Sequence, residues 1–187
     1  MGSRRGLAIA FALLAGVPAL AQGPTYGIGR APTAEEIRAR DISIGPTGEE
    51  LPVGKGSAKE GAIVFRTTCS ECHGTAGAGG AAPMLKSRTP TNPNVWARGR
   101  ILPLRAPFAT TVWDFINRAM PLEGEGTLTA NQVYALTAYL LFINGVIPED
   151  QVLDQQNLAK VKMPLGDNYA SLPDWKPRTP RLKGYPY

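Results

Sequence analysis

The sequence predicts an all-α domain with long irregular segments at both of its ends. Apolar residues recur at helical spacing in the middle of the chain, and helix-capping patterns stand beside them. No stretch shows the alternation expected of paired strands. Glycine and proline contribute 21 and 17 of the 187 residues, so a good deal of irregular chain must surround the helices.

Residues 1–21 are predicted to be a secretory signal peptide. Arg4 and Arg5 form a basic start, an apolar stretch runs from Leu7 to Val17, and small residues precede a cut at Gln22. The apolar stretch is shorter than the ~20 residues that a membrane span needs, although an uncleaved N-terminal anchor remains an alternative. We therefore expect a periplasmic or otherwise exported protein with no transmembrane segment after cleavage.

The composition excludes several classes of protein. The formal net charge is +5, and the basic residues form no run suited to nucleic acid, so we expect no nucleic-acid partner. Two cysteines are too few for a disulfide-stapled scaffold. A single histidine excludes sites that need two, such as an HExxH protease. All three of these residues fall within residues 69–73.

Residues 22–56 are expected to form an N-terminal arm. One short helix is predicted within it, from Thr33 at the cap to Arg40, because Glu36 completes a capping box with Thr33. The other residues of the arm contain turn-forming glycines and prolines and show no periodicity. An extended arm with a single helix is therefore expected.

The first long helix is predicted to start after Ser57, whose capping box is completed by Glu60. This helix leads into Cys69. Residues 74–93 then read as a loop, because they hold several glycines and three prolines.

A second helix is predicted over residues 111–119, with Thr111 and Asp114 as capping candidates. Pro121 ends it and pushes Met120 out of the helical region, so that Met120 begins a loop. The spacing i, i+3, i+4, i+7 predicts an apolar face made of Val112, Phe115, Ile116 and Ala119.

The third helix is predicted from about Ala130 to Asn144. Thr129 and Gln132 make its capping box, and Gly145 is the expected left-handed stop. Leucines and aromatic residues fill its length. It should therefore be the most deeply buried helix of the domain.

The chain is thus expected to divide into four parts. The signal peptide and the N-terminal arm precede a helical domain over residues 57–147. Residues 148–187 are rich in proline, show little periodicity and are predicted to form a C-terminal arm.

Residues 69–73 read Cys-Ser-Glu-Cys-His and carry the chemistry of the chain. On a helix, Cys69 and Cys72 share a face and can present two sulfurs to one flat object, while His73 projects toward its centre. This pattern is typical of one covalently attached haem c with His73 on the iron. A CxxC redox pair, a zinc site and a plain disulfide compete with it. The redox pair lacks a βαβ context, and the zinc site lacks a fourth ligand. The plain disulfide leaves the histidine without a role.

The iron of such a haem needs a sixth ligand or an open position. Methionine is the natural donor where no second histidine exists. Met120, beside Pro121 and between two amphipathic helices, is the favoured ligand. Met163 in the tail is a competitor, and an open position is the other alternative. Met84 follows His73 too closely to reach the opposite haem face.

Supporting contacts are predicted around the histidine. His73 should donate its other ring N–H to a carbonyl group, and Pro83 is the candidate, with an ordinary turn proline as the alternative. Trp96, Arg98 and Arg100 are candidates to reach the haem propionates. Solvated loop residues are the simpler interpretation of these three.

The order of these parts resembles a class I cytochrome c over residues 57–147. A capped helix runs into CxxCH, and a loop, a middle helix, a Met-Pro loop and a final Leu/Tyr-rich helix follow. The resemblance implies that the first and last helices cross, with Gly61 and Phe65 near Tyr134 or Ala138.

A narrower resemblance covers nearly all of the mature chain. It is to the SoxD-type and related sulfite-dehydrogenase cytochromes. It rests on Tyr26-Gly-Ile-Gly-Arg30, Glu35-Glu-Ile, Asp41-Ile-Ser-Ile-Gly-Pro46, Leu51-Pro-Val-Gly-Lys-Gly-Ser57, residues 108–121, Val133-Tyr-Ala-Leu-Thr-Ala-Tyr-Leu140 and Lys160-Val-Lys-Met-Pro164.

This resemblance implies a haem subunit that accepts electrons from a molybdenum-cofactor subunit oxidising sulfite or sulfane sulfur and passes them to a further cytochrome. It implies ligation by His73 and Met120. The chain departs from the family in one respect. Many SoxD proteins continue after the Met-Pro of the tail with an Asn-Arg-Asp-Gly-Phe run, and some carry a second haem domain, whereas here Leu165-Gly-Asp-Asn-Tyr follows and the sequence has one CxxCH.

Three functions remain to be weighed. The leading one is an electron-transferring monohaem subunit without catalytic residues of its own, whose arms bind the molybdenum partner. In the alternative for the arms, they wrap their own domain. The second function is a free soluble carrier serving a terminal oxidase. The third is a haem enzyme, which would need an open sixth position.

Overall fold

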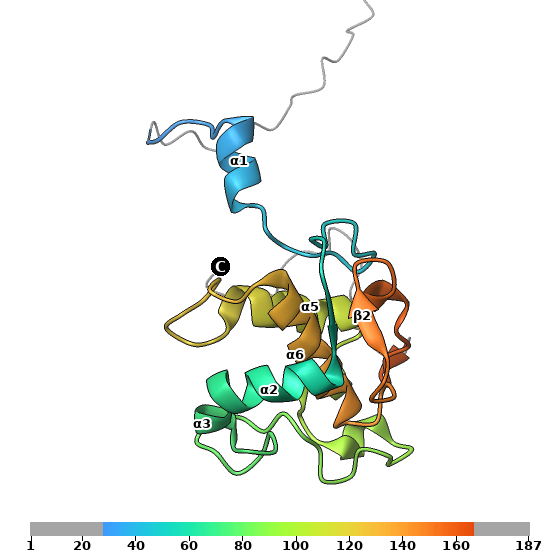
Figure 1. Ribbon diagram of the computed structural model, residues 1–187. Coiled ribbons are helices and arrows are strands. Elements are labelled where there is room, and N and C mark those ends of the chain that lie inside the picture. Colours follow the sequence, from blue (N-terminus) through green and yellow to red (C-terminus); the bar gives the residue numbers. More distant parts are fainter. Residues whose placement is uncertain (1–27, 167–187) are drawn as a thin grey trace, which may run out of the picture.

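The computed structural model describes residues 28–166, which are mostly helical (Figure 1). The predicted signal peptide and the end of the predicted C-terminal arm, residues 167–187, lie outside this range. In chain order the elements are α1 (Ala34–Arg40), β1 (Lys55–Ser57), α2 (Ala58–Thr68), α3 (Ser70–His73), the 3-10 helix η1 (Val95–Arg98), α4 (Leu102–Arg105), α5 (Ala109–Ala119), α6 (Ala130–Phe142), β2 (Val152–Asp154) and the 3-10 helix η2 (Leu158–Lys160). The predicted all-α class is confirmed. Within the described range, no helix is long and apolar enough to cross a membrane.

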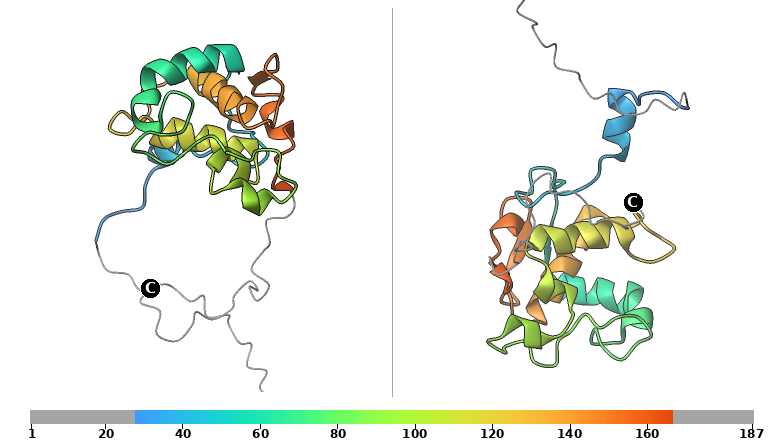
Figure 2. Two further views of the ribbon diagram at one scale, coloured as in Figure 1. Left: turned by 90° about the horizontal axis from the view of Figure 1, so that it is seen from below. Right: turned by 180° about the vertical axis from the view of Figure 1, so that it is seen from behind.

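Helix α6 lies at the centre of the domain, between α2 and α5 (Figure 2). Its residues from Val133 to Ala138 are all buried, as are Leu140 and Leu141. The Phe65 ring of α2 meets the Tyr139 ring of α6 with centroids 5.1 Å apart. The Trp113 ring of α5 meets that of Tyr134 at 5.5 Å. Aromatic contacts therefore join both neighbouring helices to α6.

The crossing of α2 and α6 depends on Gly61. A Cβ atom at this position would overlap the Ala135 carbonyl oxygen and crowd Tyr139 Cβ. Only a glycine therefore allows the two backbones to approach so closely. The crossing implied by the cytochrome resemblance is present, but Gly61 meets Ala135 and Tyr139 rather than Tyr134 or Ala138.

The three predicted capping boxes are confirmed, at Thr33, Ser57 and Thr129. In each box the cap side chain accepts from the backbone N–H three residues on, and that residue's side chain accepts from the cap N–H. The predicted stop after α6 is also present, because Gly145 adopts a φ of +70°. Such caps are local chemistry, which explains why the sequence predicts them well.

The prediction for α5 was wrong at its start and on its buried face. The helix begins at Ala109, so Thr111 and Asp114 lie within it rather than at its cap. Trp113 is buried, whereas Phe115 is exposed. The face that packs on the core thus includes Val112, Trp113 and Ile116, because the Trp113 ring finds a partner in Tyr134 of α6.

The expectation of a chain without paired strands was also wrong. Strands β1 and β2 form a two-stranded antiparallel sheet in which Gly56 is opposite Leu153. Residues beyond β2 pack on the same core, since Leu158, Met163 and Leu165 are buried. The first part of the predicted C-terminal arm, residues 148–166, is therefore part of the packed body.

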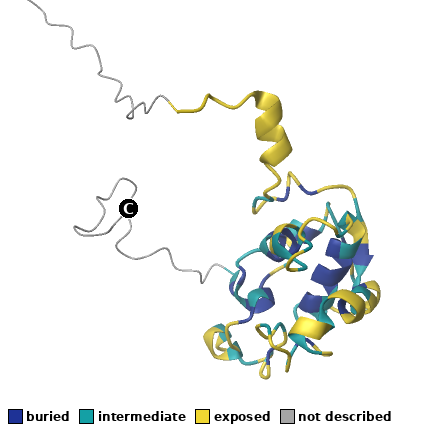
Figure 3. Ribbon diagram, turned by 90° about the vertical axis from the view of Figure 1, so that its left-hand side faces the viewer, coloured by how far each residue is buried: buried dark blue, intermediate teal, exposed yellow. Residues whose placement is uncertain are grey.

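Unlike residues 148–166, the beginning of the N-terminal arm does not pack on the core, because α1 lies apart from the packed body (Figures 1 and 3). Residues 28–43 are all exposed. An ion pair between Arg30 and Glu36 holds the segment together internally. The Arg30 guanidinium, followed by the Thr33 backbone N–H, lowers the pKa of Glu36 to about 2. The arm joins the domain at Ile44, whose N–H donates to Asp114 Oδ1 at 3.0 Å.

Replacing Gly61 by alanine tests the close crossing. In an exposed helix this substitution stabilises by roughly 1 kcal/mol, because glycine is the poorer helix former. Here we expect the free energy of unfolding to fall by about 2 kcal/mol or more, since the new methyl group must push α2 away from α6. Urea unfolding of the haem-loaded protein measures this change in the free energy of unfolding.

Gly45→Ala is the matched control. A Cβ at Gly45 would make only ordinary contact with the flexible Glu50 side chain. Its effect should stay within about 0.5 kcal/mol. An unchanged or raised stability in the Gly61 variant would contradict the proposed close contact.

Candidate haem-binding site

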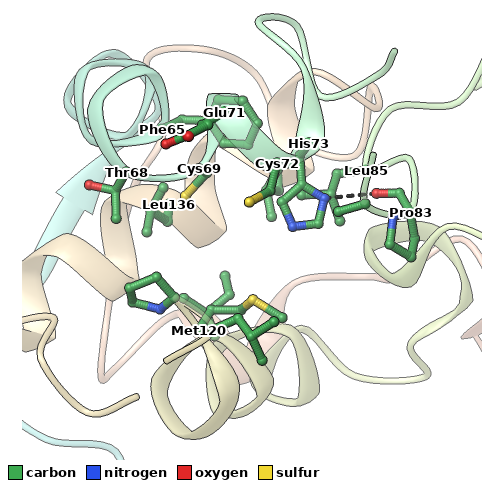
Figure 4. Close-up of a pocket in the computed structure, with 15 residues that line it drawn as sticks. Phe65, Thr68, Cys69, Glu71, Cys72, His73, Pro83, Leu85, Met120 and Leu136 are labelled. Atoms are coloured by element: carbon green, nitrogen blue, oxygen red, sulfur yellow. Dashed lines mark hydrogen bonds between the residues drawn. The ribbon is translucent and has the colours of Figure 1, made fainter. Parts of the chain in front are cut away.

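A cavity of about 380 Å³ opens between α2, α3, the end of α5 and α6 (Figure 4). Its walls are mainly apolar side chains of these elements and of the loops that follow α3 and α5. They comprise Phe65, Leu85, Ile116, Leu136 and Leu140, with Pro121 and Leu122 at the loop that follows α5. The volume and the apolar lining are typical of a site for an organic cofactor.

The Cys-Ser-Glu-Cys-His motif lies along one side of this cavity. Helix α2 ends at Thr68, and α3 restarts at Ser70, so that Cys69 sits at the junction of the two helices. The two sulfurs and the His73 ring face the same space (Figure 4). The predicted juxtaposition of these three side chains is therefore what the local fold produces.

The state of the two thiols bears on the competing interpretations. Both cysteines are free rather than joined to one another. Burial, followed by the nearby Cys72, raises the pKa of the Cys69 thiol to about 11. Such a thiol is protonated at neutral pH, unlike the reactive thiolates of redox CxxC pairs. Within residues 28–166, no cluster of three or more His, Cys, Asp or Glu residues could hold a metal ion by itself. Redox and zinc chemistry are therefore poorly supported.

The His73 ring is oriented by the loop that follows the motif. Its Nδ1 lies 2.8 Å from the Pro83 carbonyl oxygen (Figure 4), so a proton on Nδ1 would be donated to that carbonyl. The loop itself is tied to the motif, because Ala82 N–H donates to the Cys72 carbonyl at 2.8 Å. Gly80 passes so close to the Cys72 carbonyl that a Cβ there would overlap it. With Nδ1 engaged, Nε2 is the nitrogen left to bind a metal.

Met120 faces the motif from the opposite wall of the cavity (Figure 4). It caps the C-terminus of α5, where its N–H donates to the Ile116 carbonyl at 3.1 Å. The other two candidate methionines lie elsewhere. Met84 is exposed and Met163 is buried in the core, and neither lines the cavity.

The three candidates for propionate contacts do not line the cavity. Arg98 donates to the Asn92 carbonyl, and Trp96 lies under the guanidinium of Arg105 at 4.3 Å from the ring centroid. These contacts form a separate surface cluster around η1. The simpler interpretation fits only in part, because Trp96 and Arg100 are exposed as solvated residues would be, but Trp96 and Arg98 belong to η1 rather than to a loop.

Several wall residues had not been identified from the sequence as part of a site. Helical periodicity marked Ile116, Leu136 and Leu140 as apolar, but it could not distinguish the cavity wall from the rest of the core. Leu85 and Leu122 lie in loops, where periodicity gives no signal at all. Only the three-dimensional arrangement places these five side chains around one space.

The residues present fit a haem c. A flat macrocycle needs apolar walls, an imidazole on one side, and two thiols at its rim, and the cavity offers all of these. A thioether on the far wall completes a possible ligand pair. The orientation of His73 by the Pro83 carbonyl is the kind of outer contact that fixes a metal-binding imidazole.

Comparisons with known proteins agree with this fit. Residues 56–140 match the family model described as cytochrome c oxidase, cbb3-type, subunit III. Among solved structures, a chain of the crystal structure of the sulfane dehydrogenase SoxCD from Paracoccus pantotrophus aligns with a TM-score of 0.65 and 28% identity, over 86% of this chain and 82% of that chain. The search of curated proteins found no match.

A cytochrome c domain implies a haem c and a role in electron transfer. The predicted class I cytochrome fold is therefore confirmed together with the all-α class. The protein resembles the class I c-type cytochromes, and among them the SoxD-type cytochromes.

Proposed function

We propose that this protein is the monohaem subunit of an exported sulfur-oxidising enzyme. It accepts electrons from a molybdenum-cofactor subunit that oxidises sulfite or sulfane sulfur, and it passes them to a downstream cytochrome or oxidase. The observation that carries the proposal is the cavity in which Cys69, Cys72 and His73 face Met120. The likeness to a chain of SoxCD supports the choice of partner.

Each site residue has a defined part in this proposal. Cys69 and Cys72 would hold the single haem through thioether bonds, and His73 and Met120 would ligate its iron. Pro83 orients the His73 ring through its carbonyl group. The bound haem supplies the one-electron redox centre, and the chain supplies ligands, apolar surroundings and an attachment to its partner.

The same arrangement favours electron transfer over catalysis. With His73 and Met120 on opposite sides of the cavity, both available to ligate the iron, a bound haem would leave no place at the metal for a substrate. The walls are mainly apolar, and Glu71 is the one carboxylate among the lining residues. An acid/base pair of the kind a hydrolytic or peroxidatic site needs is not assembled there.

The beginning of the N-terminal arm is the part best placed to hold the partner. Residues 28–43 are all exposed, and they include the large apolar side chains of Ile28, Ile37 and Ile42. A helix of seven residues is marginal in water by itself, so α1 gains stability when a partner covers it. Residues 148–166 instead wrap their own domain, as the alternative for the arms predicted.

A free carrier serving a terminal oxidase is the second candidate. The observation that favours it is the family model, which is named for a subunit of an oxidase. Native purification separates the two. A free carrier elutes as a monomer and takes up no electrons from a sulfite-oxidising partner, whereas a subunit co-purifies with molybdenum and its haem band reduces on addition of sulfite or a sulfane-sulfur substrate.

Replacing Met120 by alanine tests the axial ligand. We expect the low-spin ferric spectrum to become high-spin and the reduction potential to fall, because Met/His ligation raises the potential of a haem. Met84→Ala should leave the spectrum unchanged, because this side chain is exposed and away from the cavity. Met163→Ala should stay low-spin while losing about 2–5 kcal/mol of stability, because Met163 is buried in the core. A low-spin Met120 variant would argue for another ligand.

Substitution on α1 tests the docking role of the arm. Ile37→Asp places a charge on an apolar side chain of α1 that is 49% exposed, so we expect the co-purified molybdenum per haem to drop at least about tenfold while the haem spectrum is unchanged. Ile63→Asp is the control, since Ile63 is 57% exposed but lies on α2. Removal of residues 167–187 in a third variant reports on the tail. Full molybdenum recovery with the Ile37 variant would contradict docking through α1.

A further inference from the structure

Asn144 is a buried polar residue just after α6 that does not line the cavity. Its side chain is 1% exposed and makes three hydrogen bonds. Oδ1 accepts from Ser87 N–H at 2.9 Å, and Nδ2 donates to the carbonyls of Leu85 and Leu140 at 2.8 Å each. Because one partner donates and two accept, the orientation of the amide is determined by chemistry.

These bonds anchor the loop that orients His73. The backbone of Leu85 is held from both sides, since its N–H donates to Gly77 at 2.8 Å and its carbonyl accepts from Asn144. On the other side of Pro83, Ala82 N–H donates to the Cys72 carbonyl. Pro83 has no N–H of its own, so its carbonyl is placed by the anchored residues around it.

A buried amide costs free energy unless every polar group is satisfied, and leucine would fill similar space among the leucines of α6. Here the amide spans from the C-terminal end of α6 to a loop that is distant in sequence. The groups that it holds lead directly to the His73 ring, through Leu85 and Pro83. The side chain of Asn144 therefore links the end of α6 to the His73 loop, in addition to filling space in the core.

We propose that Asn144 is a positioning residue for the axial histidine, acting through the loop of residues 83–87 to hold the Pro83 carbonyl against His73 Nδ1. This inference rests on the proposed haem ligation by His73. A hydrogen bond from Nδ1–H to a carbonyl raises the basicity of the ligating nitrogen, which favours the oxidised iron. Loosening the loop weakens that hydrogen bond and raises the reduction potential.

The test is Asn144→Leu in the full-length haem-loaded protein. This substitution keeps the volume and removes all three hydrogen bonds without adding a charge. We expect a positive shift of the reduction potential, measured by spectroelectrochemical titration. We also expect exchange of the His73 ring N–H with deuterium, followed by NMR in the reduced state, to become about tenfold faster, because the opening of the loop costs less.

Asn131→Ala is the matched control. Asn131 lies in the first turn of α6 and, like Asn144, accepts from a distant backbone group. Its partner is Lys55 N–H at 2.9 Å, so its bond leads to β1 rather than to the histidine loop. It should leave the potential and the ring exchange unchanged. An equal shift in this control would overturn the proposal, since the effect would then follow from general loosening of α6.

If the Asn144→Leu variant does not accumulate as folded protein, Asn144→Ser is tested in its place. The smaller side chain admits water beside the stranded carbonyls, and a positive shift in the same direction is expected. A folded Asn144 variant with unchanged potential and unchanged ring exchange overturns this inference alone. A wild-type protein without haem overturns the proposed function and this inference together.

Discussion

The contact between the backbones of α2 and α6 at Gly61 determines where the motif and the opposite wall of the cavity lie. Because α3 follows α2 after a single residue, the direction in which α2 leaves this crossing determines where the CxxCH motif lies. On the other side of the same contact, α6 presents Leu136 and Leu140 to the cavity. One close approach, possible only for glycine, thereby places both cysteines of the motif and the wall that they face.

The features that the sequence predicts correctly depend on residues close together in the chain. The capping boxes and the CxxCH motif depend on side chains three or four residues apart, so their chemistry is complete within one helical turn. Which face of α5 is buried, in contrast, depends on residues far away in the sequence. Trp113 and Phe115 are both aromatic and both compatible with a helical face, and the choice between them depends on Tyr134, which belongs to another helix.

The same distinction explains the site and the C-terminal segment. Met120 and Met163 both stand before a proline, and only the three-dimensional fold puts one on the cavity and the other in the core. The β1–β2 pair has three residues in each strand, too few to show an alternating pattern. Leu153 and Leu158 lie beyond the predicted end of the domain, yet they are buried because they cover α6 and α5. No periodicity within their own segment predicts this burial.

The two sides of the cavity are supported in different ways. His73 is held by hydrogen bonds that run through its loop to the end of α6. A thioether is only a weak hydrogen-bond acceptor, so the place of Met120 depends on where α5 ends. Helix α5 also anchors the arm, since Asp114 accepts from Ile44 N–H and pairs with Arg118.

Helix α5 therefore connects the segment that we propose to dock with the wall that carries the proposed ligand. A partner held by α1 would be tethered to the haem domain through only the few residues between Arg40 and Ile44. Tethering converts each electron transfer from a collision into an intramolecular step at high effective concentration. An exposed, self-capped helix at the end of a short strap favours this arrangement, because a carrier that met its partners by collision would gain nothing from leaving Ile37 and Ile42 uncovered.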